Sequence, residues 1–404
     1  MSKISIAVIL IFVLLACGCT PVVNLDMTTA GTESSVPSTE PPATEPPVVE
    51  PSAAEVLLSK MTLREKVGQL FIVYPENLVD SQPGGSMAAV TSVSKLLTDG
   101  LAQYPVGGVT LFGTNVIDPA QLSALTADLS EAGKIPMFIS VDEEGGRVAR
   151  IGNNAAFGVK TYGSAAAVGA AGNRADGLEM GNTIGAYLKQ YGFNLDFAPV
   201  GDVFTNPANT VIGNRAFSTN ASTAALMAEA MAAGLKAQGI IPTYKHFPGH
   251  GDTAQDSHSQ LAVSYKTLEE MKACEWLPFM KATDADMVMV GHIACPNITG
   301  DMLPASLSET MVTDHLRGTC GFDGLIITDA MNMGAITNTY GAGNAAVMAI
   351  QAGCDIILLP GDFEAAFSAV LAAAENGTIS AQRLDESVLR ILEYKVNYGI
   401  ISGE

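Results

Sequence analysis

Short runs of apolar or β-branched residues alternate with longer Ala-, Leu- and Met-rich stretches along most of the chain after Ala53. The short runs have the length of buried strands, and the long stretches carry apolar residues at helical spacing. Eight strands are predicted, at Leu70–Val73, Gly108–Phe112, Met137–Val141, Asn194–Ala198, Ile240–Tyr244, Met287–Gly291, Leu325–Thr328 and Ile356–Leu359. The predicted helices are Leu122–Ala132, Ala165–Gln190, Ser222–Gln238, Thr267–Thr283, Glu309–Arg317, Asn344–Ala352, Phe363–Asn376 and Arg383–Tyr394.

Eight strand–helix repeats predict an α/β fold, a (β/α)₈ barrel of the TIM type, with a doubly wound open sheet as the alternative. The barrel is favoured because polar residues directly follow several predicted strands, namely Asp142, Lys245 with His246, His292, and Asp329. In a barrel the carboxyl ends of all strands meet on one face, where the loops build the active site. We therefore expect these side chains to share one pocket.

The N-terminal segment differs in composition from the rest of the chain. An apolar run, Ile4–Ala16, follows Lys3 and is too short to span a bilayer comfortably, which is typical of a signal peptide. The next residues include Cys17 and Cys19 in a pattern that resembles a bacterial lipobox, where a cysteine becomes lipid-modified after cleavage. Cys17 fits this pattern better than Cys19; an uncleaved apolar anchor is the alternative.

Residues 20–52 are rich in Pro, Thr, Ser and Glu, the composition of an extended, disordered linker. The predicted organisation is thus a lipoprotein signal peptide over 1–19, a linker over 20–52 and a barrel over 53–404. It implies an exported protein, anchored by lipid to the cell membrane, with the barrel outside the cytoplasm.

The overall charge restricts the class of partner. The net charge of −20 and the pI of about 4.5 argue against nucleic acid or an anionic bilayer surface as a partner, because both would repel the protein. Ligands that are neutral or carry mixed charge are favoured, and a monomeric protein is expected. The remaining cysteines have no CxxC spacing and are predicted to be buried thiols rather than a zinc site, although one disulfide stays open: Cys274, Cys295, Cys320 and Cys354.

One segment, Lys245–His258, concentrates three of the five histidines, two aspartates and a lysine around glycines. Such ionisable groups must pair with one another, bind a metal or contact a ligand. Asp256 and His258 are two residues apart, so the carboxylate can orient the imidazole for general acid and base catalysis. His250 and Asp252 form a second, less convincing pair. Either pair could instead only stabilise the loop.

Asp329 follows an apolar strand and could attack an electrophilic carbon to form a covalent intermediate. A helix-capping aspartate is the structural alternative. A nucleophile on one side of a sugar and a proton donor at the leaving oxygen are the two groups that glycoside cleavage needs.

These motifs resemble those of the glycoside hydrolase family 3 β-N-acetylhexosaminidases over the whole predicted barrel. The matching blocks are Met61–Leu70, Val141–Arg150, Phe197–Val203, Asn214–Ser218, Lys245–Gly251 and Asp256–His258. The resemblance implies a retaining exo-hydrolase that releases terminal N-acetylglucosamine from peptidoglycan fragments or chitooligosaccharides. It implies that Asp329 is the nucleophile and that His258, partnered by Asp256, is the acid/base. It also implies sugar contacts from Asp142, Arg150, Arg215, Lys245 and His246, with no cofactor and no metal.

The chain departs from the family pattern at three points. Glu143 occupies a variable position without obvious effect, and Ala330 follows Asp329 where many relatives have an acidic residue. A second domain found in some relatives is not expected here.

Other functions remain open from sequence. A family 3 phosphorylase or β-glucosidase would use the same site, and a non-catalytic sugar-binding lipoprotein would retain the pocket without turnover. A metal-dependent hydrolase could use His246, His250, Asp252, Asp256 and His258, but these do not have an accepted zinc spacing.

Overall fold

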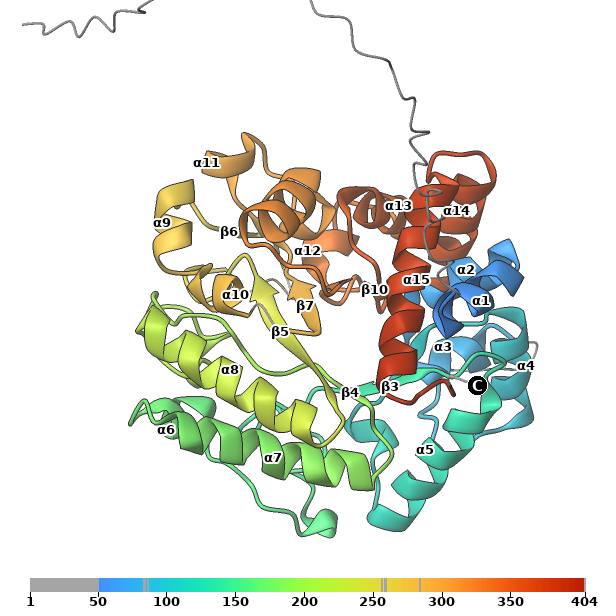
Figure 1. Cartoon of the computed structure of the whole chain (residues 1–404), viewed down its shortest axis with the longest axis horizontal. Coiled ribbons are helices and arrows are strands. Elements are labelled where there is room, and N and C mark those ends of the chain that lie inside the picture. The colour runs from blue at the N-terminus through green and yellow to red at the C-terminus, as the bar shows by residue number, and fades with distance from the viewer. Residues whose placement is uncertain are drawn as a thin grey trace, which may run out of the picture. The chain divides into compact units, whose positions relative to one another are not determined.

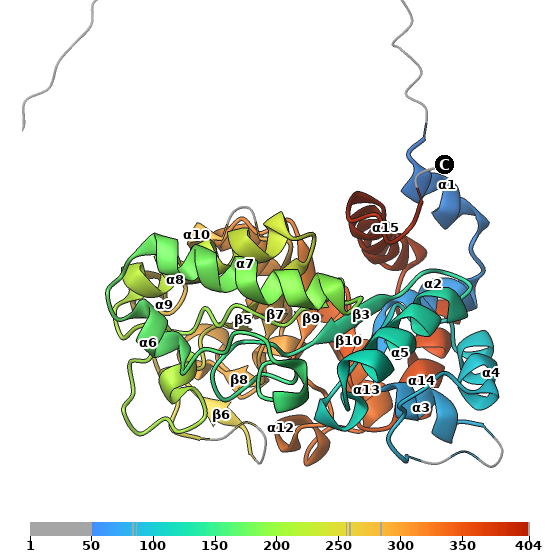
Figure 2. The ribbon, with the colours of Figure 1, turned by 90° about the horizontal axis from the view of Figure 1, so that it is seen from below.

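Eight parallel strands form the centre of the protein and confirm the predicted (β/α)₈ fold (Figures 1 and 2). The computed structural model describes residues 51–82, 85, 87–255, 257, 260–282 and 285–402. The barrel strands are β1 (Phe71–Val73), β2 (Gly108–Thr110), β3 (Phe138–Val141), β4 (Leu195–Asp196), β5 (Ile241–Phe247), β7 (Met287–Val290), β9 (Leu325–Thr328) and β10 (Ile357–Leu358). Each overlaps one predicted strand.

The sheet closes on itself. Its order is β10-β1-β2-β3-β4-β5-β7-β9, with parallel neighbours throughout. The last gap is bridged by a parallel pair between Ile327 and Ile356, where the Thr328 N–H donates to the Ile356 carbonyl at 3.0 Å. The open doubly wound alternative is wrong, because such a sheet would leave two edge strands without partners.

Helices enclose the barrel (Figure 1). The longer ones are α4 (Lys95–Gln103), α5 (Pro119–Ala132), α7 (Arg174–Gln190), α8 (Ala221–Ala237), α13 (Ala342–Ala352), α14 (Phe363–Glu375) and α15 (Ala381–Asn397). The shorter ones are α1 (Ala53–Lys60), α2 (Leu63–Gln69), α3 (Pro75–Asp80), α6 (Ala165–Gly169), α9 (Leu268–Ala273), α10 (Leu277–Lys281), α11 (Pro296–Thr299) and α12 (Gly334–Thr337). Four 3₁₀ turns are η1 (Gly113–Asn115), η2 (Ala155–Phe157), η3 (Gly213–Arg215) and η4 (Ala305–Leu307), and η5 (Thr310–Thr319) is a π-helix.

Two predicted helices are broken. The prediction Ala165–Gln190 covers both α6 and α7, which are separated by Gly172 with a φ of +60° that a continuing helix does not adopt. The prediction Thr267–Thr283 covers both α9 and α10, and Pro278 begins the second helix in the first turn, where its missing N–H costs nothing. A two-stranded sheet of β6 (Ala262–Val263) and β8 (Ile293–Ala294) was not predicted.

The barrel strands are buried on both faces, as their continuous apolar sequence requires. Leu325–Thr328, for example, is buried at every position. At the amino end of the barrel, the buried Asp355 binds three arginines: Arg317, Arg383 and Arg390. The opposite, carboxyl end carries the polar residues predicted to form the site.

The cysteines of the described barrel are free thiols, as expected from their spacing. Cys295 and Cys354 are buried, and Cys274 and Cys320 are half-buried. Among the described residues, no helix combines the length and apolar character needed to cross a membrane.

Candidate active site

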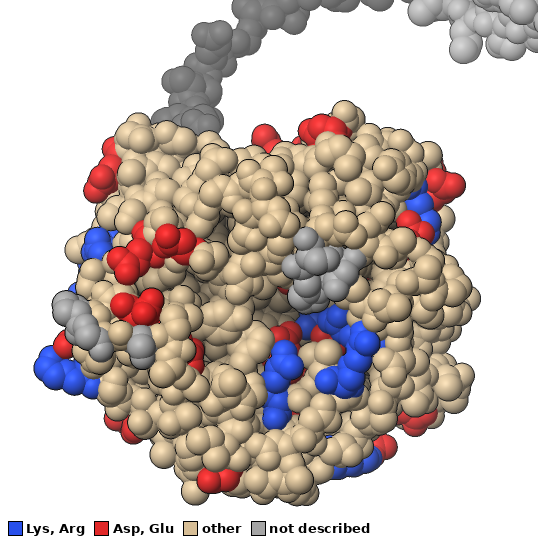
Figure 3. Space-filling view, turned by 180° about the vertical axis from the view of Figure 1, so that it is seen from behind, with Lys and Arg blue, Asp and Glu red and all other residues tan. Residues whose placement is uncertain are grey.

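A cavity of about 470 Å³ opens at the carboxyl end of the barrel. Each of the eight barrel strands contributes to its wall, through residues of the loop that follows it or, for β7, through Met289 of the strand itself. Figure 3 shows a hollow in this face where acidic and basic side chains gather, while most of the surrounding surface consists of other residues. The predicted site residues that the structure describes all line this cavity: Asp142, Arg150, Arg215, Lys245, His246 and Asp329.

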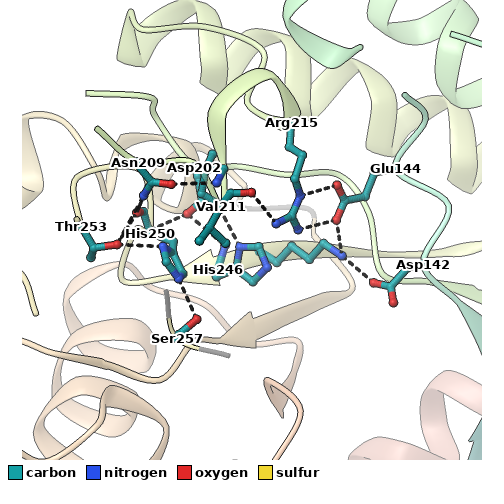
Figure 4. Close-up of polar contacts among 12 residues, drawn as sticks. Asp142, Glu144, Asp202, Asn209, Val211, Arg215, His246, His250, Thr253 and Ser257 are labelled. Atoms are coloured by element: carbon teal, nitrogen blue, oxygen red, sulfur yellow. Dashed lines mark hydrogen bonds and ion pairs between the residues drawn. The ribbon is translucent and has the colours of Figure 1, made fainter. Parts of the chain in front are cut away.

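Lys245 is the centre of a charge network with Asp142, Glu144 and Arg215, which are labelled in Figure 4. Its Nζ lies 2.7 Å from Asp142 Oδ1 and 2.7 Å from Glu144 Oε1. Arg215 donates to both oxygens of Glu144, at 2.8 and 2.7 Å. Burial opposes charge on Lys245, but the two carboxylates outweigh it and raise its pKa, while Arg215 and Lys245 hold the pKa of Glu144 well below its usual range despite burial. Glu144, Arg215 and Lys245 are therefore ionised at neutral pH.

Glu144 was given no role from sequence, although it stands in the Asp-Glu-Glu block. It is only 3% exposed and shares Lys245 with Asp142. A fully paired carboxylate here keeps the lysine and arginine in fixed positions, with Asp142 at 20% side-chain exposure left nearer the cavity.

Arg150 extends along another part of the wall. Its Nη2 lies 3.3 Å from Asp142 Oδ2, and its guanidinium stacks over the Phe112 ring at 5.0 Å. Its Nε is buried and has no hydrogen-bond partner among the described residues.

Glu143 corrects the expectation that this position has no obvious effect. Its carboxylate is fully buried and accepts hydrogen bonds from the backbone of Arg150, Ile151 and Gly152 and from the Tyr187 hydroxyl. Burial raises its pKa, and these hydrogen bonds act in the opposite direction. Glu143 therefore stabilises the turn that carries Arg150.

Asp329 lies at the end of β9. Its N–H donates to the Val290 carbonyl, and its Oδ1 accepts the Ala330 N–H at 2.8 Å. Burial raises the pKa of Asp329, but the positive potential of His246, His292 and Lys245 outweighs burial and lowers the pKa below its usual value. The carboxylate is ionised at neutral pH, as a nucleophile must be.

His246 is oriented by Asp202, which sequence reasoning did not single out. The His246 Nδ1 lies 2.7 Å from Asp202 Oδ2, and Asp202 Oδ1 accepts the backbone N–H of both His246 and His250. Asp202 is fully buried and, although burial opposes it, interactions with His246 and His250 lower its pKa. This contact leaves the Nε2 of His246 as the ring nitrogen available for a ligand.

The predicted pair of His250 and Asp252 does not form. The His250 ring instead lies between two hydroxyls, with Nε2 2.8 Å from Ser257 Oγ and Nδ1 2.9 Å from Thr253 Oγ1 (Figure 4). Asp252 points to Lys266 at 3.2 Å and accepts from Ser264. The prediction was wrong because residues 250–252 form a bend and turn rather than an extended segment, so the two side chains do not share one side of the backbone.

Two predicted catalytic residues, Asp256 and His258, lie outside the described residues. Ser257 between them is described and is buried. Its carbonyl accepts the Ala335 N–H at 3.4 Å, which links this segment to α12, the helix that follows Asp329 in the chain. In the described parts of the barrel, no group of three or more His, Cys, Asp or Glu side chains is arranged to hold a metal ion.

The cavity thus presents an ionised carboxylate, Asp329, beside a fixed set of hydrogen-bond donors and acceptors. Three carboxylates and four cations line it: Asp142, Glu144, Asp329, Arg147, Arg150, Arg215 and Lys245. This near balance of charge suits a small, hydroxyl-rich neutral ligand.

Comparison with known proteins identifies relatives. Residues 62–394 match the model for the glycosyl hydrolase family 3 N-terminal domain. The chain is 32% identical over 339 residues to β-hexosaminidase A of Pseudoalteromonas piscicida, covering 77% of this chain and 57% of that protein. It is also 32% identical to β-hexosaminidase LpqI of Mycobacterium tuberculosis, covering 82% of each chain.

A solved structure shows the same fold. The glycoside hydrolase family 3 β-N-acetylglucosaminidase from Paenibacillus sp. FPU-7 superposes with a TM-score of 0.78 at 36% identity, covering 85% of this chain and 64% of that one. The chain therefore spans somewhat less than two thirds of two of these relatives and most of the third.

Proposed function

Because this chain belongs to glycosyl hydrolase family 3, we propose that it is a retaining exo-β-N-acetylhexosaminidase that releases terminal N-acetylglucosamine from β-linked glycans. The observation that carries the proposal is the ionised Asp329 in one cavity with the Lys245, Asp142 and Glu144 network. The printed names of the relatives, β-hexosaminidase and β-N-acetylglucosaminidase, support the sugar preference.

The proposed mechanism has two steps. An Asp329 oxygen attacks the anomeric carbon as the bond to the leaving oxygen breaks, and His258, partnered by Asp256, gives its proton to that oxygen. His258 then takes a proton from water, the water oxygen attacks the anomeric carbon, and the bond to Asp329 breaks. The double displacement retains the configuration of the sugar.

The sugar is held by five side chains. Asp142 accepts hydrogen bonds from hydroxyls, and Arg150, Arg215 and Lys245 donate to sugar oxygens, while His246 offers its Nε2. The ion pairs within the network restrict these groups before the substrate arrives, so less entropy is lost on binding.

The direct test uses an aryl N-acetyl-β-glucosaminide. We expect hydrolysis with retained configuration, which NMR of the first-formed sugar would detect. Asp329→Asn should lose this activity. A 5-fluoro N-acetylglucosaminide that inactivates the enzyme should label Asp329, as peptide mapping would show. Normal turnover by Asp329→Asn would overturn the assignment of the nucleophile.

The acceptor and the sugar are tested in the same assay. Formation of a sugar phosphate in phosphate buffer would indicate a phosphorylase, and faster cleavage of an aryl glucoside would indicate a β-glucosidase. Binding of N-acetylglucosamine without turnover by the wild type would indicate a sugar-binding protein. Chelators should leave the rate unchanged, and a loss of activity would favour a metal-dependent hydrolase.

We further propose that the enzyme is an exported lipoprotein that acts as a monomer on cell-wall fragments or chitooligosaccharides outside the cytoplasm. The proposal rests on the lipobox-like sequence at Cys17 and Cys19. Labelling with an alkyne fatty acid in a bacterial host should mark the protein and fail in Cys17→Ser. If the label persisted in Cys17→Ser and was lost in Cys19→Ser, Cys19 would be the lipid-modified cysteine instead. Light scattering would report the oligomeric state.

A further inference from the structure

Three consecutive acidic residues after β3 point to two different sides of the chain. Asp142 and Glu144 point toward Lys245 in the cavity, whereas Glu143 points away from it toward Tyr187 of α7. The alternation is that of an extended backbone, whose successive side chains face opposite directions. Glu143 therefore does not line the cavity, and the proposed mechanism gives it no role.

The Glu143 carboxylate is completely enclosed by donors. Its Oε2 accepts the N–H of Arg150 at 2.6 Å and of Ile151 at 3.0 Å. Its Oε1 accepts the N–H of Gly152 at 2.7 Å and the hydroxyl of Tyr187 at 2.8 Å. Four contacts are thus made with four donors, so an amide or an alkyl group in its place would leave buried N–H groups without acceptors.

The turn packs directly against this carboxylate. A Cβ placed on Gly152 would lie 2.9 Å from Glu143 Oε1, so no side chain fits between the turn and the acid. The carboxylate is therefore in direct contact with the backbone of the turn, which is also anchored in the core by the buried side chain of Ile151.

The first residue of this turn is Arg150, whose side chain enters the cavity. The backbone N–H of Arg150 is bonded to Glu143, while its guanidinium contacts Asp142 and stacks over Phe112. The Arg150 Nε is buried with no partner among the described residues, and the side chain as a whole lines the cavity.

We propose that Glu143 is a positioning residue that fixes Arg150 in the cavity wall and thereby determines how tightly the terminal sugar is bound. This inference rests on the proposed function and adds a residue to it. Glu143 does not contact the substrate; it acts through the backbone of Arg150.

The test compares four single variants and one double variant by steady-state kinetics on an aryl N-acetyl-β-glucosaminide. Glu143→Gln keeps the side-chain volume but turns one acceptor oxygen into a donor that faces two donors. We expect its KM to rise about tenfold with a much smaller change in kcat, because an interaction equal in the ground and transition states is weakened. Tyr187→Phe removes one donor and should raise KM about two- to threefold; it preserves the test if Glu143→Gln does not fold.

A double-mutant cycle separates positioning from a general loss of structure. In an Arg150→Ala background, Glu143→Gln should have no further effect on KM, because the group through which it acts is gone. Glu65→Gln is the matched control: Glu65 is a buried, hydrogen-bonded acid of α2, at the opposite end of the barrel, and its substitution should leave KM unchanged.

Two results would overturn the inference: a wild-type KM in folded Glu143→Gln, or an equal KM increase with and without Arg150. The affinity of the same variants for N-acetylglucosamine, measured by calorimetry, should follow the same pattern. If the wild type showed no turnover, the proposed function would fail, and the calorimetric cycle would still decide the role of Glu143.

Discussion

The Nε2 atom of His250 lies 2.8 Å from the hydroxyl oxygen of Ser257, the residue between Asp256 and His258 in the sequence. The other ring nitrogen contacts Thr253 at 2.9 Å. Burial lowers the pKa of His250, so the ring is neutral at neutral pH, with one donor and one acceptor nitrogen that are both in use. His250 is therefore not free to act as the acid/base. His250 instead binds Ser257, the sequence neighbour of His258, which is the proposed acid/base.

Removal of the Ser257 hydroxyl should break its hydrogen bond with His250 and leave the segment that carries His258 less well positioned. We expect Ser257→Ala to lower kcat about three- to tenfold, the value of one hydrogen bond of about 1 kcal/mol, with little change in KM. Steady-state kinetics on the aryl substrate measures this effect. Ser130→Ala, which removes an exposed hydroxyl bonded to the Ala127 carbonyl, is the control and should behave as the wild type. An unchanged kcat in Ser257→Ala would exclude a role for the contact.

Removal of the Lys245 charge should affect both stability and activity. Lys245→Met leaves Asp142 without its closest cation and Glu144 with Arg215 alone, so we expect a loss of about 3 kcal/mol in the free energy of unfolding. Adding Glu144→Gln should increase the loss further, because the buried guanidinium of Arg215 then loses the carboxylate that it contacts. Urea unfolding measures both variants. Activity should remain low in the double variant, since the proposed sugar contact of Lys245 is not restored.

The Asp355 cluster should be important for stability and irrelevant to the chemistry. Asp355 is fully buried, contacts Arg317 and Arg390 at 2.7 Å each, and accepts the Ser387 hydroxyl. Asp355→Asn should reduce the free energy of unfolding by about 3 to 5 kcal/mol, because the guanidinium groups lose their counter-charge. The KM of the folded fraction should not change.

Its control is Asp99→Asn, which breaks an exposed pair with Lys95 on α4 and should cost less than about 1 kcal/mol. If both variants were equally stable, the arginines would not depend on the carboxylate of Asp355.

Lys395 should make the free energy of unfolding depend on pH between neutral and alkaline values. This lysine is fully buried in α15, donates to Gln69 Oε1 at 2.7 Å and lies over the Phe138 ring. Burial lowers its pKa from 10.5 to about 7. Between these two values the unfolded chain binds more protons than the folded one, so this group makes the free energy of unfolding rise with pH in that window.

Lys395→Met should remove that dependence. The variant should gain stability relative to the wild type near pH 7, and the difference should shrink as the pH rises toward about 10. Chemical unfolding at several pH values measures it. Lys189→Met is the control, at an exposed lysine in the last turn of α7. Its free energy of unfolding should differ from that of the wild type by the same amount at every pH. A parallel course of the Lys395→Met and wild-type curves would contradict the lowered pKa.

The sequence alone predicted the strands and favoured the barrel, and the structure then excluded the open sheet. Strands buried on both faces must be apolar at every position, so runs such as Leu325–Thr328 were visible without a structure. Polar residues that end such runs, including Asp142, Lys245 and Asp329, could be assigned to one face because parallel strands end together. The break at Gly172 was not predicted, since a glycine within an Ala-rich run reads as a tolerated helix residue.

Only the tertiary structure decided which charged groups pair. The sequence pattern gave Glu143 no role and paired His250 with Asp252, yet Glu143 holds the turn of Arg150, and Asp252 binds Lys266. Asp202, unnoticed in the sequence, orients His246 across 44 residues. The physical reason is that a buried carboxylate binds whichever donors the fold brings within about 3 Å, and that set depends on distant segments rather than on neighbours in the chain.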